Sequence, residues 1–167
     1  MAIATGTSWI PAYIGVGSNL DDPLSQVGRG IDSLANIPQT RVVARSKMYR
    51  NRPMGPQDQP EYVNAAVGVL TQLSPAELLS ELKKMESKLG RGVPIVRWGP
   101  RIIDFDLLVF GSVKLATETL VIPHPGIAAR NFVLLPLFDI APDLDIPGAG
   151  RVAPLLQAID RSGVHAL

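Results

Sequence analysis

Asp104 and Asp106 are the residues of this chain whose types and spacing point most clearly to chemistry. They are the only carboxylates in RWGPRIIDFDLLVF (97–110), a run of branched and aromatic residues typical of a buried strand. Because side chains two apart in a strand project to the same side, both carboxylates share one face. Ile103, Phe105 and Leu107 are then expected to face the core. Two like charges this close are unfavourable unless a cation lies between them, and oxygen ligands suit Mg²⁺. The pair therefore predicts a magnesium site.

Arginines precede this carboxylate pair, at Arg91, Arg97 and Arg101. The planar guanidinium group donates two parallel hydrogen bonds and keeps its charge, which suits it to polyphosphate. A structural ion-pair cluster is the alternative. Against it, five of the sixteen residues 91–106 are charged, compared with 19% of the whole chain, and charges on a largely buried segment are costly without a function or complete pairing. The segment therefore indicates a site for Mg²⁺ and a polyphosphate.

The composition is that of an ordinary globular protein. A chain of 167 residues with 46% hydrophobic content is expected to form a single domain over residues 1–167. A net charge of +1 argues against binding nucleic acid by bulk electrostatics. The absence of cysteine excludes disulfides, thiolate metal sites and thiol catalysis. The sequence has no apolar run of membrane-spanning length and no basic start followed by an apolar block, so we expect a soluble cytoplasmic protein.

Three stretches before the carboxylate pair have the composition of strands. They are residues 9–18, 41–49 and 62–71. The loop 50–61 between the last two holds three prolines and no apolar periodicity. The first strand runs into GVGSNL (15–20), which lacks the third glycine of a dinucleotide-binding loop and the lysine of a P-loop. We interpret GVGSNL as a tight turn that borders the site.

Two helices are expected between these strands. Asp21 or Asp22 followed by Pro23 is typical of a helix start. Apolar residues then recur at helical spacing, at Leu24, Val27, Ile31 and Leu34. Ser74 and Glu77 match a capping box around Pro75, and the helix that they begin is expected to end at Gly90. The order β-α-β-β-α-β predicts an α+β, ferredoxin-like core, in which an antiparallel sheet has both helices on one face and the active site on the other.

A C-terminal extension follows this core from about residue 112. It holds a short extended segment, the turn IPHPG (122–126), an apolar run at 132–138 and an expected helix at 154–161. The two long loops that precede the third and fourth strands should border the free face of the sheet, with the aspartates on its floor.

Four segments together resemble a known family. They are YIGVGSNL, YRNRPMGPQDQPEYVNAAV, GRGVPIVRWGPRIIDFDLLVFG and IPHPGIAARNFVLLPLFDIAPDL, and they span most of the chain, from about Tyr13 to Leu144. In this order they are similar to the 6-hydroxymethyl-7,8-dihydropterin pyrophosphokinases of folate biosynthesis, and RWGPRxxDxDLL is highly specific for that family. The resemblance implies a ferredoxin-like fold and an enzyme that transfers the terminal pyrophosphate of ATP to the pterin and releases AMP.

By this resemblance, Asp104 and Asp106 hold two Mg²⁺ ions that bridge the triphosphate of the co-substrate ATP and the pterin hydroxyl group. Little covalent work falls to the protein in such a displacement, so positioning and charge neutralisation dominate. Arg91 and Arg101 match catalytic arginines that contact the phosphates. The resemblance assigns further ATP contacts to Arg97, Trp98, Leu107, His124, Arg130 and Glu86.

The resemblance also implies a pterin site. Tyr62 and Phe132 match two rings that sandwich the pterin, and Asn64 matches the residue that binds its pyrimidine-like edge, because an amide offers both a donor and an acceptor. Backbone contacts to the pterin are implied mainly at Asn51, Arg52 and Met54.

The chain departs from the family pattern at three places. Asn51-Arg52 stands where a threonine-proline pair is common, Val93-Pro94 lies in a loop that often carries an additional arginine, and Pro125 follows the histidine where a tyrosine is sometimes found. We expect these changes to affect the flexibility of the loops and the affinity for the nucleotide.

Without the resemblance, several of these residues have ordinary structural explanations. Tyr62 suits packing at a strand start, Phe132 suits a core, and His124 between prolines suits a surface turn. Glu86 suits a solvated or ion-paired position on a helix.

Other functions compete with the pyrophosphokinase hypothesis. The same carboxylates could serve another Mg²⁺-dependent nucleotidyl or phosphoryl transferase, or a pterin-binding protein without catalysis. A ferredoxin-like RNA-binding module is disfavoured, because it needs aromatic residues and positive charge on the sheet face, where this chain has two aspartates. We expect small-molecule substrates, no nucleic acid or membrane partner, and a monomer.

Overall fold

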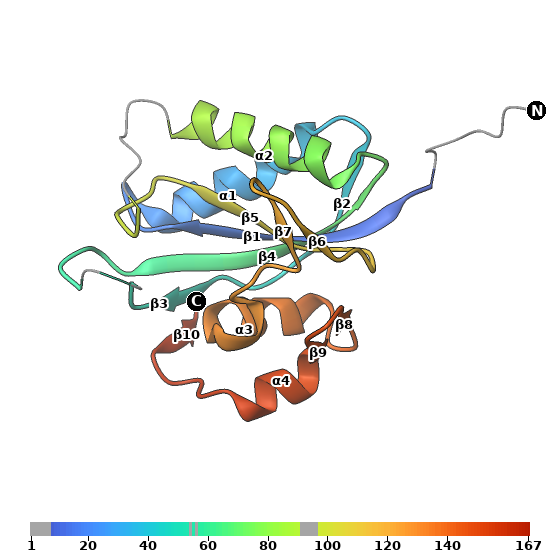
Figure 1. Cartoon of the computed structure of the whole chain (residues 1–167). Helices are drawn as coiled ribbons and strands as arrows, with labels where there is room; N and C mark the ends of the chain where they lie inside the picture. Colours follow the sequence, from blue (N-terminus) through green and yellow to red (C-terminus); the bar gives the residue numbers. More distant parts are fainter. Residues whose placement is uncertain (1–7, 54, 56, 91–96) are drawn as a thin grey trace, which may run out of the picture.

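The fold has three layers, with the main sheet between two pairs of helices (Figure 1). The computed structural model describes residues 8–53, 55, 57–90 and 97–167. The helices are α1 (Pro23–Ser33), α2 (Pro75–Leu89), α3 (Asn131–Ile140) and α4 (Val152–Ala158), with short 3₁₀ helices at Leu34–Asn36 and Ile127–Ala129. Helices α1 and α2 cover one face of the sheet, and α3 and α4 lie on the other side. Among the described residues, no helix is long and apolar enough to span a membrane.

The main sheet has six strands in the order β10-β3-β4-β1-β5, with β2 pairing to β4 beside β3. All its pairings are antiparallel. Its strands are β1 (Ile10–Ser18), β2 (Thr40–Arg45), β3 (Tyr49–Asn51), β4 (Tyr62–Thr71), β5 (Asp104–Phe110) and β10 (Val164–Ala166). Two small hairpins are formed by β6 (Leu115–Ala116) with β7 (Val121–Ile122) and by β8 (Asp145–Ile146) with β9 (Gly150–Arg151). The expected α+β, ferredoxin-like core is confirmed.

The strand expected at 41–49 is two strands, β2 and β3. The pairing of β2 with β4 shifts register at Val43, and after β2 the hydroxyl oxygen of Ser46 accepts a hydrogen bond from the Ala66 amide (2.8 Å). A side chain thus replaces a backbone carbonyl as the partner of β4, which interrupts the ladder between the two strands.

Both predicted helix starts are confirmed. At α2 the Ser74 hydroxyl accepts from the Glu77 amide (3.1 Å), and the Glu77 carboxylate accepts from the Ser74 amide (2.9 Å), as a capping box requires. Of the predicted apolar stripe, Val27 and Ile31 on α1 are buried, as is Leu34 at the start of the 3₁₀ helix that follows, whereas Leu24 in the first turn of α1 is 47% exposed.

Strand β5 and the residue before it contribute side chains to two separate cores. Ile103, Phe105 and Leu107 are buried on the side of α1 and α2, as the alternation predicts. Leu108 and Val109 pack instead on the side of α3 and α4. The change follows from a register shift between β1 and β5, which leaves Leu108 without a partner and turns the following residues over.

The C-terminal extension covers part of the sheet face that was expected to be free. The apolar run 132–138 lies within α3, a helix that contains Pro136, and the helix expected at 154–161 is α4. The last strand, β10, pairs with β3 and so extends the sheet beyond its ferredoxin-like core. The remaining open part of this face holds the candidate site.

Candidate active site

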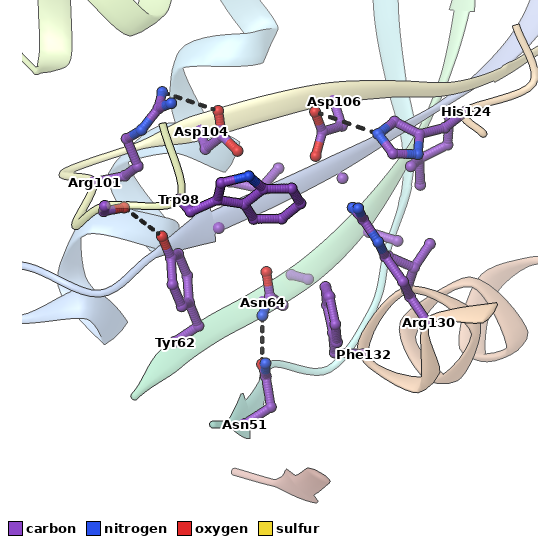
Figure 2. Close-up of a pocket in the computed structure, with 18 of the residues that line it drawn as sticks. Asn51, Tyr62, Asn64, Trp98, Arg101, Asp104, Asp106, His124, Arg130 and Phe132 are labelled. Carbon is purple, nitrogen blue, oxygen red and sulfur yellow. Dashed lines mark hydrogen bonds and ion pairs between the residues drawn. The ribbon is translucent and has the colours of Figure 1, made fainter. Parts of the chain in front are cut away.

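A pocket of about 290 Å³ opens on the sheet face opposite α1 and α2, beside the start of α3 (Figure 2). Its walls come from β1, β4, β5, the loop before β5 and the segment that leads into α3. The pocket brings together most of the sequence-predicted site residues: Asn51, Tyr62, Asn64, Arg97, Trp98, Arg101, Asp104, Asp106, His124, Arg130 and Phe132. Residues far apart in the sequence therefore converge on one cavity.

The two carboxylates project from β5 into this pocket, on the same face of the sheet. Their partners in β1 are glycines, since Gly15 pairs with Asp106 and Gly17 pairs with Asp104. Paired residues in neighbouring strands share a face, so the absence of side chains at these glycines leaves room beside both carboxylates. GVGSNL was interpreted as a tight turn, but its glycines lie within β1 and form the pocket floor.

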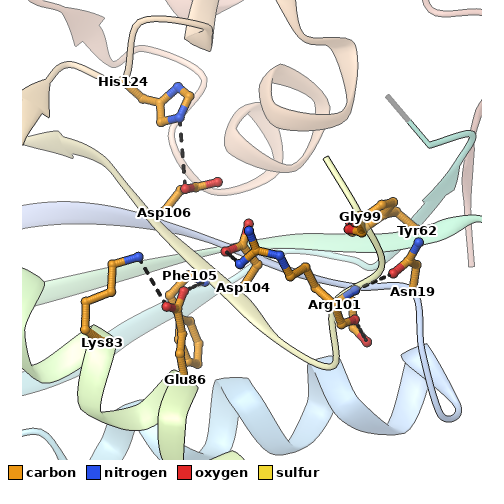
Figure 3. Close-up of polar contacts among 11 residues, drawn as sticks. Asn19, Tyr62, Lys83, Glu86, Gly99, Arg101, Asp104, Phe105, Asp106 and His124 are labelled. Carbon is orange, nitrogen blue, oxygen red and sulfur yellow. Dashed lines mark hydrogen bonds and ion pairs between the residues drawn. The ribbon is translucent and has the colours of Figure 1, made fainter. Parts of the chain in front are cut away.

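The carboxylates are only loosely paired within the described part of the chain. Asp104 lies 3.7 Å from the Arg101 guanidinium group, and Asp106 lies 4.0 Å from Nε2 of His124 (Figure 3). Their side chains remain 35% and 42% exposed. Burial, followed by the charge of Asp104, raises the pKa of Asp106 to about 7, and the Arg130 charge opposes this rise. For Asp106 to be ionised beside Asp104 at neutral pH, further positive charge is thus needed.

The donor set fits Mg²⁺ that is shared with a phosphate ligand. Two partly exposed carboxylates supply hard oxygen atoms, and Mg²⁺ commonly takes one or two carboxylates together with substrate phosphates and water. Over the described residues, no group of three His, Cys, Asp or Glu side chains could form a complete protein cage. Arg97, Arg101 and Arg130 line the same pocket and could bind the phosphates.

His124 presents a hydrogen-bond donor to this region. Its Nδ1 accepts from the Gly126 amide (3.1 Å), so in the neutral ring Nε2 carries the proton and faces Asp106. Burial, and next the charge of Arg130, lowers the pKa of His124 below its ordinary value. The neutral imidazole can therefore donate to a phosphate oxygen.

A hydrogen-bond network holds the loop that carries Trp98. The Trp98 carbonyl accepts from Nε2 of Gln59 (2.9 Å), and the Gly99 carbonyl accepts from the Tyr62 hydroxyl (3.1 Å). Trp98 has a φ of +61° and is 47% exposed. An aromatic residue in this backbone conformation needs support from its surroundings, which these two bonds supply.

Asn19 is the centre of that network, and sequence reasoning missed its role. The side chain is fully buried. Its Nδ2 donates to Gln59 Oε1 (2.9 Å) and to the Pro60 carbonyl (3.0 Å), and its Oδ1 accepts from the Arg101 amide (2.8 Å; Figure 3). Asn19 thereby joins the end of β1, the loop before β4 and the loop before β5. Its place in a turn beside GVG is a weak signal for such a role.

The predicted aromatic and amide residues lie on the other side of the pocket from the carboxylates. Tyr62 comes from the start of β4, Phe132 from the first turn of α3, and Asn64 lies between them in Figure 2. The Arg130 guanidinium carbon is 5.9 Å from the centre of the Phe132 ring. Two rings flanking an amide form a suitable site for a flat heterocycle.

Two of the predicted ATP-contacting side chains lie away from the pocket. Leu107 is 3% exposed in the core beside α1 and α2, because its place in β5 turns it away from the carboxylates. Glu86 lies on α2, where Oε2 accepts from the Phe105 amide (2.7 Å) and Oε1 from Lys83 Nζ (3.2 Å; Figure 3). Glu86 thus binds the backbone of β5 at Phe105, the residue between the two aspartates. Burial raises its pKa above the ordinary value.

Three further predicted positions do not contribute side chains to the described pocket. Arg52 faces a separate surface hollow beside Arg50 and His165, which agrees with the expectation of mainly backbone contacts. Met54 and Arg91 lie outside the described residues, as does the Val93-Pro94 departure.

Comparisons with known proteins agree on one family. Residues 13–142 match the family described as 7,8-dihydro-6-hydroxymethylpterin-pyrophosphokinase. Two proteins named 2-amino-4-hydroxy-6-hydroxymethyldihydropteridine pyrophosphokinase are each 42% identical: the one from Haemophilus influenzae over 89% of this chain and 92% of its own length, and the one from Pseudomonas aeruginosa over 93% and 95%.

A solved structure shares the fold. The crystal structure of wild-type Plasmodium falciparum HPPK-DHPS with pteroate matches at a TM-score of 0.71 and 14% identity, over 89% of this chain and 42% of that longer chain. The chain spans less than half of that structure, so this match concerns the fold alone. With a family match over residues 13–142 and two bacterial relatives at 42% identity, the chain belongs to the 7,8-dihydro-6-hydroxymethylpterin-pyrophosphokinase family.

Proposed function

We propose that this protein transfers the terminal pyrophosphoryl group of ATP to 6-hydroxymethyl-7,8-dihydropterin and releases AMP, a step of folate biosynthesis. The observation that carries this proposal is the pocket itself, in which a carboxylate pair lies across from an amide flanked by two rings. One side of the cavity suits a metal-bound triphosphate, and the other suits a flat heterocycle.

In this reaction the pterin hydroxyl oxygen bonds to the β-phosphorus of ATP. The bond from that phosphorus to the oxygen bridging the α-phosphate breaks, AMP leaves with the bridging oxygen, and the hydroxyl proton passes to solvent. Asp104 and Asp106 would hold two Mg²⁺ ions, which supply charge neutralisation and alignment of the phosphates. Arg101, Arg97 and Arg130 would bind phosphate oxygens.

The remaining pocket residues would orient the two substrates. Tyr62 and Phe132 would hold the pterin ring between their faces, and Asn64 would bind its polar edge. Trp98 would close over the bound substrates and exclude water from the reacting atoms. Nε2 of His124 would donate to a phosphate oxygen. Backbone groups of Asn51 and its neighbours would complete the pterin contacts.

Product analysis tests the proposal. Incubation with ATP, Mg²⁺ and the hydroxymethyl dihydropterin should yield AMP and the pyrophosphorylated pterin. Formation of ADP would instead indicate a phosphoryl transferase, and free pyrophosphate a nucleotidyl transferase. Asp104→Asn should lower the rate by orders of magnitude while the protein remains folded, whereas Asp143→Asn, at an exposed carboxylate remote from the pocket, should leave it unchanged.

We also propose that the enzyme acts as a monomer on small molecules, without a nucleic-acid partner. A net charge of +1 supports the absence of a nucleic-acid partner, and the monomer follows from the family resemblance. Light scattering on the purified protein checks the monomer, and a mass twice that of the 17.9 kDa chain would contradict it. The cytoplasmic location stays a prediction.

A further inference from the structure

The side-chain amide of Asn51 has a fixed orientation. Asn51 is 4% exposed, and its Nδ2 donates to the carbonyl oxygen of Arg52 (2.9 Å). A backbone carbonyl can only accept, so this contact requires the nitrogen end of the amide. The oxygen end, Oδ1, is therefore the end that faces Asn64 (Figure 2).

This orientation determines which way the next amide faces. Because Asn51 presents an oxygen, Asn64 must answer with its NH₂ group, and Nδ2 of Asn64 donates to Oδ1 of Asn51. The carbonyl end of Asn64 then points the other way. It lies over Gly17, its pairing partner in β1, where a Cβ would come within 2.6 Å of Asn64 Oδ1. Gly17 lines the pocket, so the amide presents an acceptor to the cavity.

Strands on both sides of β3 hold Asn51 in place. Asn51 pairs with Tyr62 in β4 and with Val164 in β10. The segment that leads into β10 is tied to the start of α3, because Asn131 Nδ2 donates to the carbonyls of Asp160 (2.9 Å) and Ser162 (3.2 Å). The C-terminal extension thus supports the Asn51 backbone next to the site.

We propose that Asn51 is a specificity-determining positioning residue, which orients the Asn64 amide so that its oxygen accepts from a donor-bearing edge of the bound heterocycle. The inference rests on the proposed pterin site. A ligand with an N–H or amino group opposite Asn64 makes this bond, whereas a ligand with an acceptor or a C–H there leaves a desolvated oxygen unpaired, which lowers affinity about tenfold or more.

Without Asn51, the terminal torsion of Asn64 is free to present either end of the amide. Asn51→Ala should therefore lose discrimination as well as some affinity. Asn51→Asp still offers an oxygen to Asn64 Nδ2, so it should keep the discrimination even where its overall affinity falls.

The test measures binding of 6-hydroxymethyl-7,8-dihydropterin and of two analogues that each lack one of its donors, the 2-oxo and the 3-deaza compounds, with Mg²⁺ and a non-hydrolysable ATP analogue. In the wild type, at least one analogue should bind about tenfold or more weakly than the parent. In Asn51→Ala this ratio should shrink to about threefold or less, and in Asn51→Asp it should persist. Asn36→Ala, at an exposed asparagine, is the matched control.

Each outcome of this test either supports or overturns the proposal. A merely structural role of Asn51 would weaken all three ligands equally and leave the ratios unchanged in Asn51→Ala, which would overturn the proposal. So would a wild type that binds the parent and both analogues equally well. A wild type that does not bind the parent compound at all would instead refute the proposed function.

Discussion

Replacing Asn19 with alanine should loosen the pocket, because this one buried amide joins the end of β1 to the loops before β4 and β5. The substitution leaves the Pro60 carbonyl and the Arg101 amide without their partner and frees Gln59, which holds the Trp98 carbonyl. An unpaired buried polar group costs roughly 1–3 kcal/mol. Pro60 is exposed and Arg101 is half-buried, so water can replace part of the lost bonds. We therefore expect the free energy of unfolding to fall by about 3 kcal/mol, less than the sum of the separate costs.

Urea denaturation followed by circular dichroism measures this change. Asn19→Asp refines the test, because the carboxylate still accepts from the Arg101 amide but places an oxygen against the Pro60 carbonyl. Because this oxygen brings charge into a fully buried position beside another acceptor, the variant should lose at least as much stability as the alanine variant. Asn36→Ala, an exposed asparagine, should change stability by less than about 0.5 kcal/mol.

The same substitution should also change the surroundings of Trp98. The chain has two tryptophans, so a Trp9→Phe background isolates the fluorescence of Trp98. In that background, Asn19→Ala should increase acrylamide quenching of Trp98 and raise the KM for ATP about tenfold, equivalent to about 1.4 kcal/mol. The reasoning is refuted if Asn19→Ala unfolds within about 0.5 kcal/mol of the wild type and leaves Trp98 quenching unchanged.

Other predictions concern the carboxylates and the pocket floor. The pKa of Asp106 is raised to about 7 from 3.8, so in the protein without ligands the folded state loses stability as pH rises from about 4 to 7. Since the side chain is 42% exposed, this loss is about 1 kcal/mol. In thermal melts, Asp106→Asn should therefore be more stable than the wild type at pH 8 but not at pH 4. Glu86→Ala frees an amide of β5 and should lower kcat more than it raises the KM for pterin; an equal change in both would contradict a role in positioning the aspartates. Gly17→Ala puts a Cβ 2.6 Å from Asn64 Oδ1 and should weaken pterin binding about tenfold in calorimetry. Gly28→Ala is the control, because the atom nearest to its added Cβ, the methyl carbon of Met48, is 4.0 Å away, and it should leave pterin binding unchanged.

Local sequence patterns predicted much of the fold and of the site. Alternation in β5 predicted that Asp104 and Asp106 share a face and that Phe105 is buried on the other. The Ser74–Glu77 capping box predicted the start of α2 within one residue, because a cap depends only on neighbours in the chain. The family resemblance supplied most of the residues that line the pocket.

What the sequence did not predict depends on contacts between distant segments. Asn19 acts through loops about 40 and 82 residues away, and no local pattern shows that they meet. Glu86 was expected near ATP, but its position on α2 aims it at a backbone amide of β5. GVGSNL was interpreted as a turn because glycines are common in turns. The role of Gly15 and Gly17 in leaving room beside the carboxylates depends on their pairing with β5, which the sequence does not show. Helix α3 was not predicted, because it contains Pro136 and because its uniformly apolar run shows no helical periodicity.

The unpaired residue in β5 has a consequence for how the protein tolerates mutation. Leu108 adds one position to β5 that β1 does not match, and this decides which of the two cores Val109 and Phe110 each enter. Exchanging one apolar residue for another here should be mild, whereas deleting a single residue would swap the surroundings of both neighbours. Evolutionary drift in this strand is therefore expected to proceed by substitution, with its length preserved.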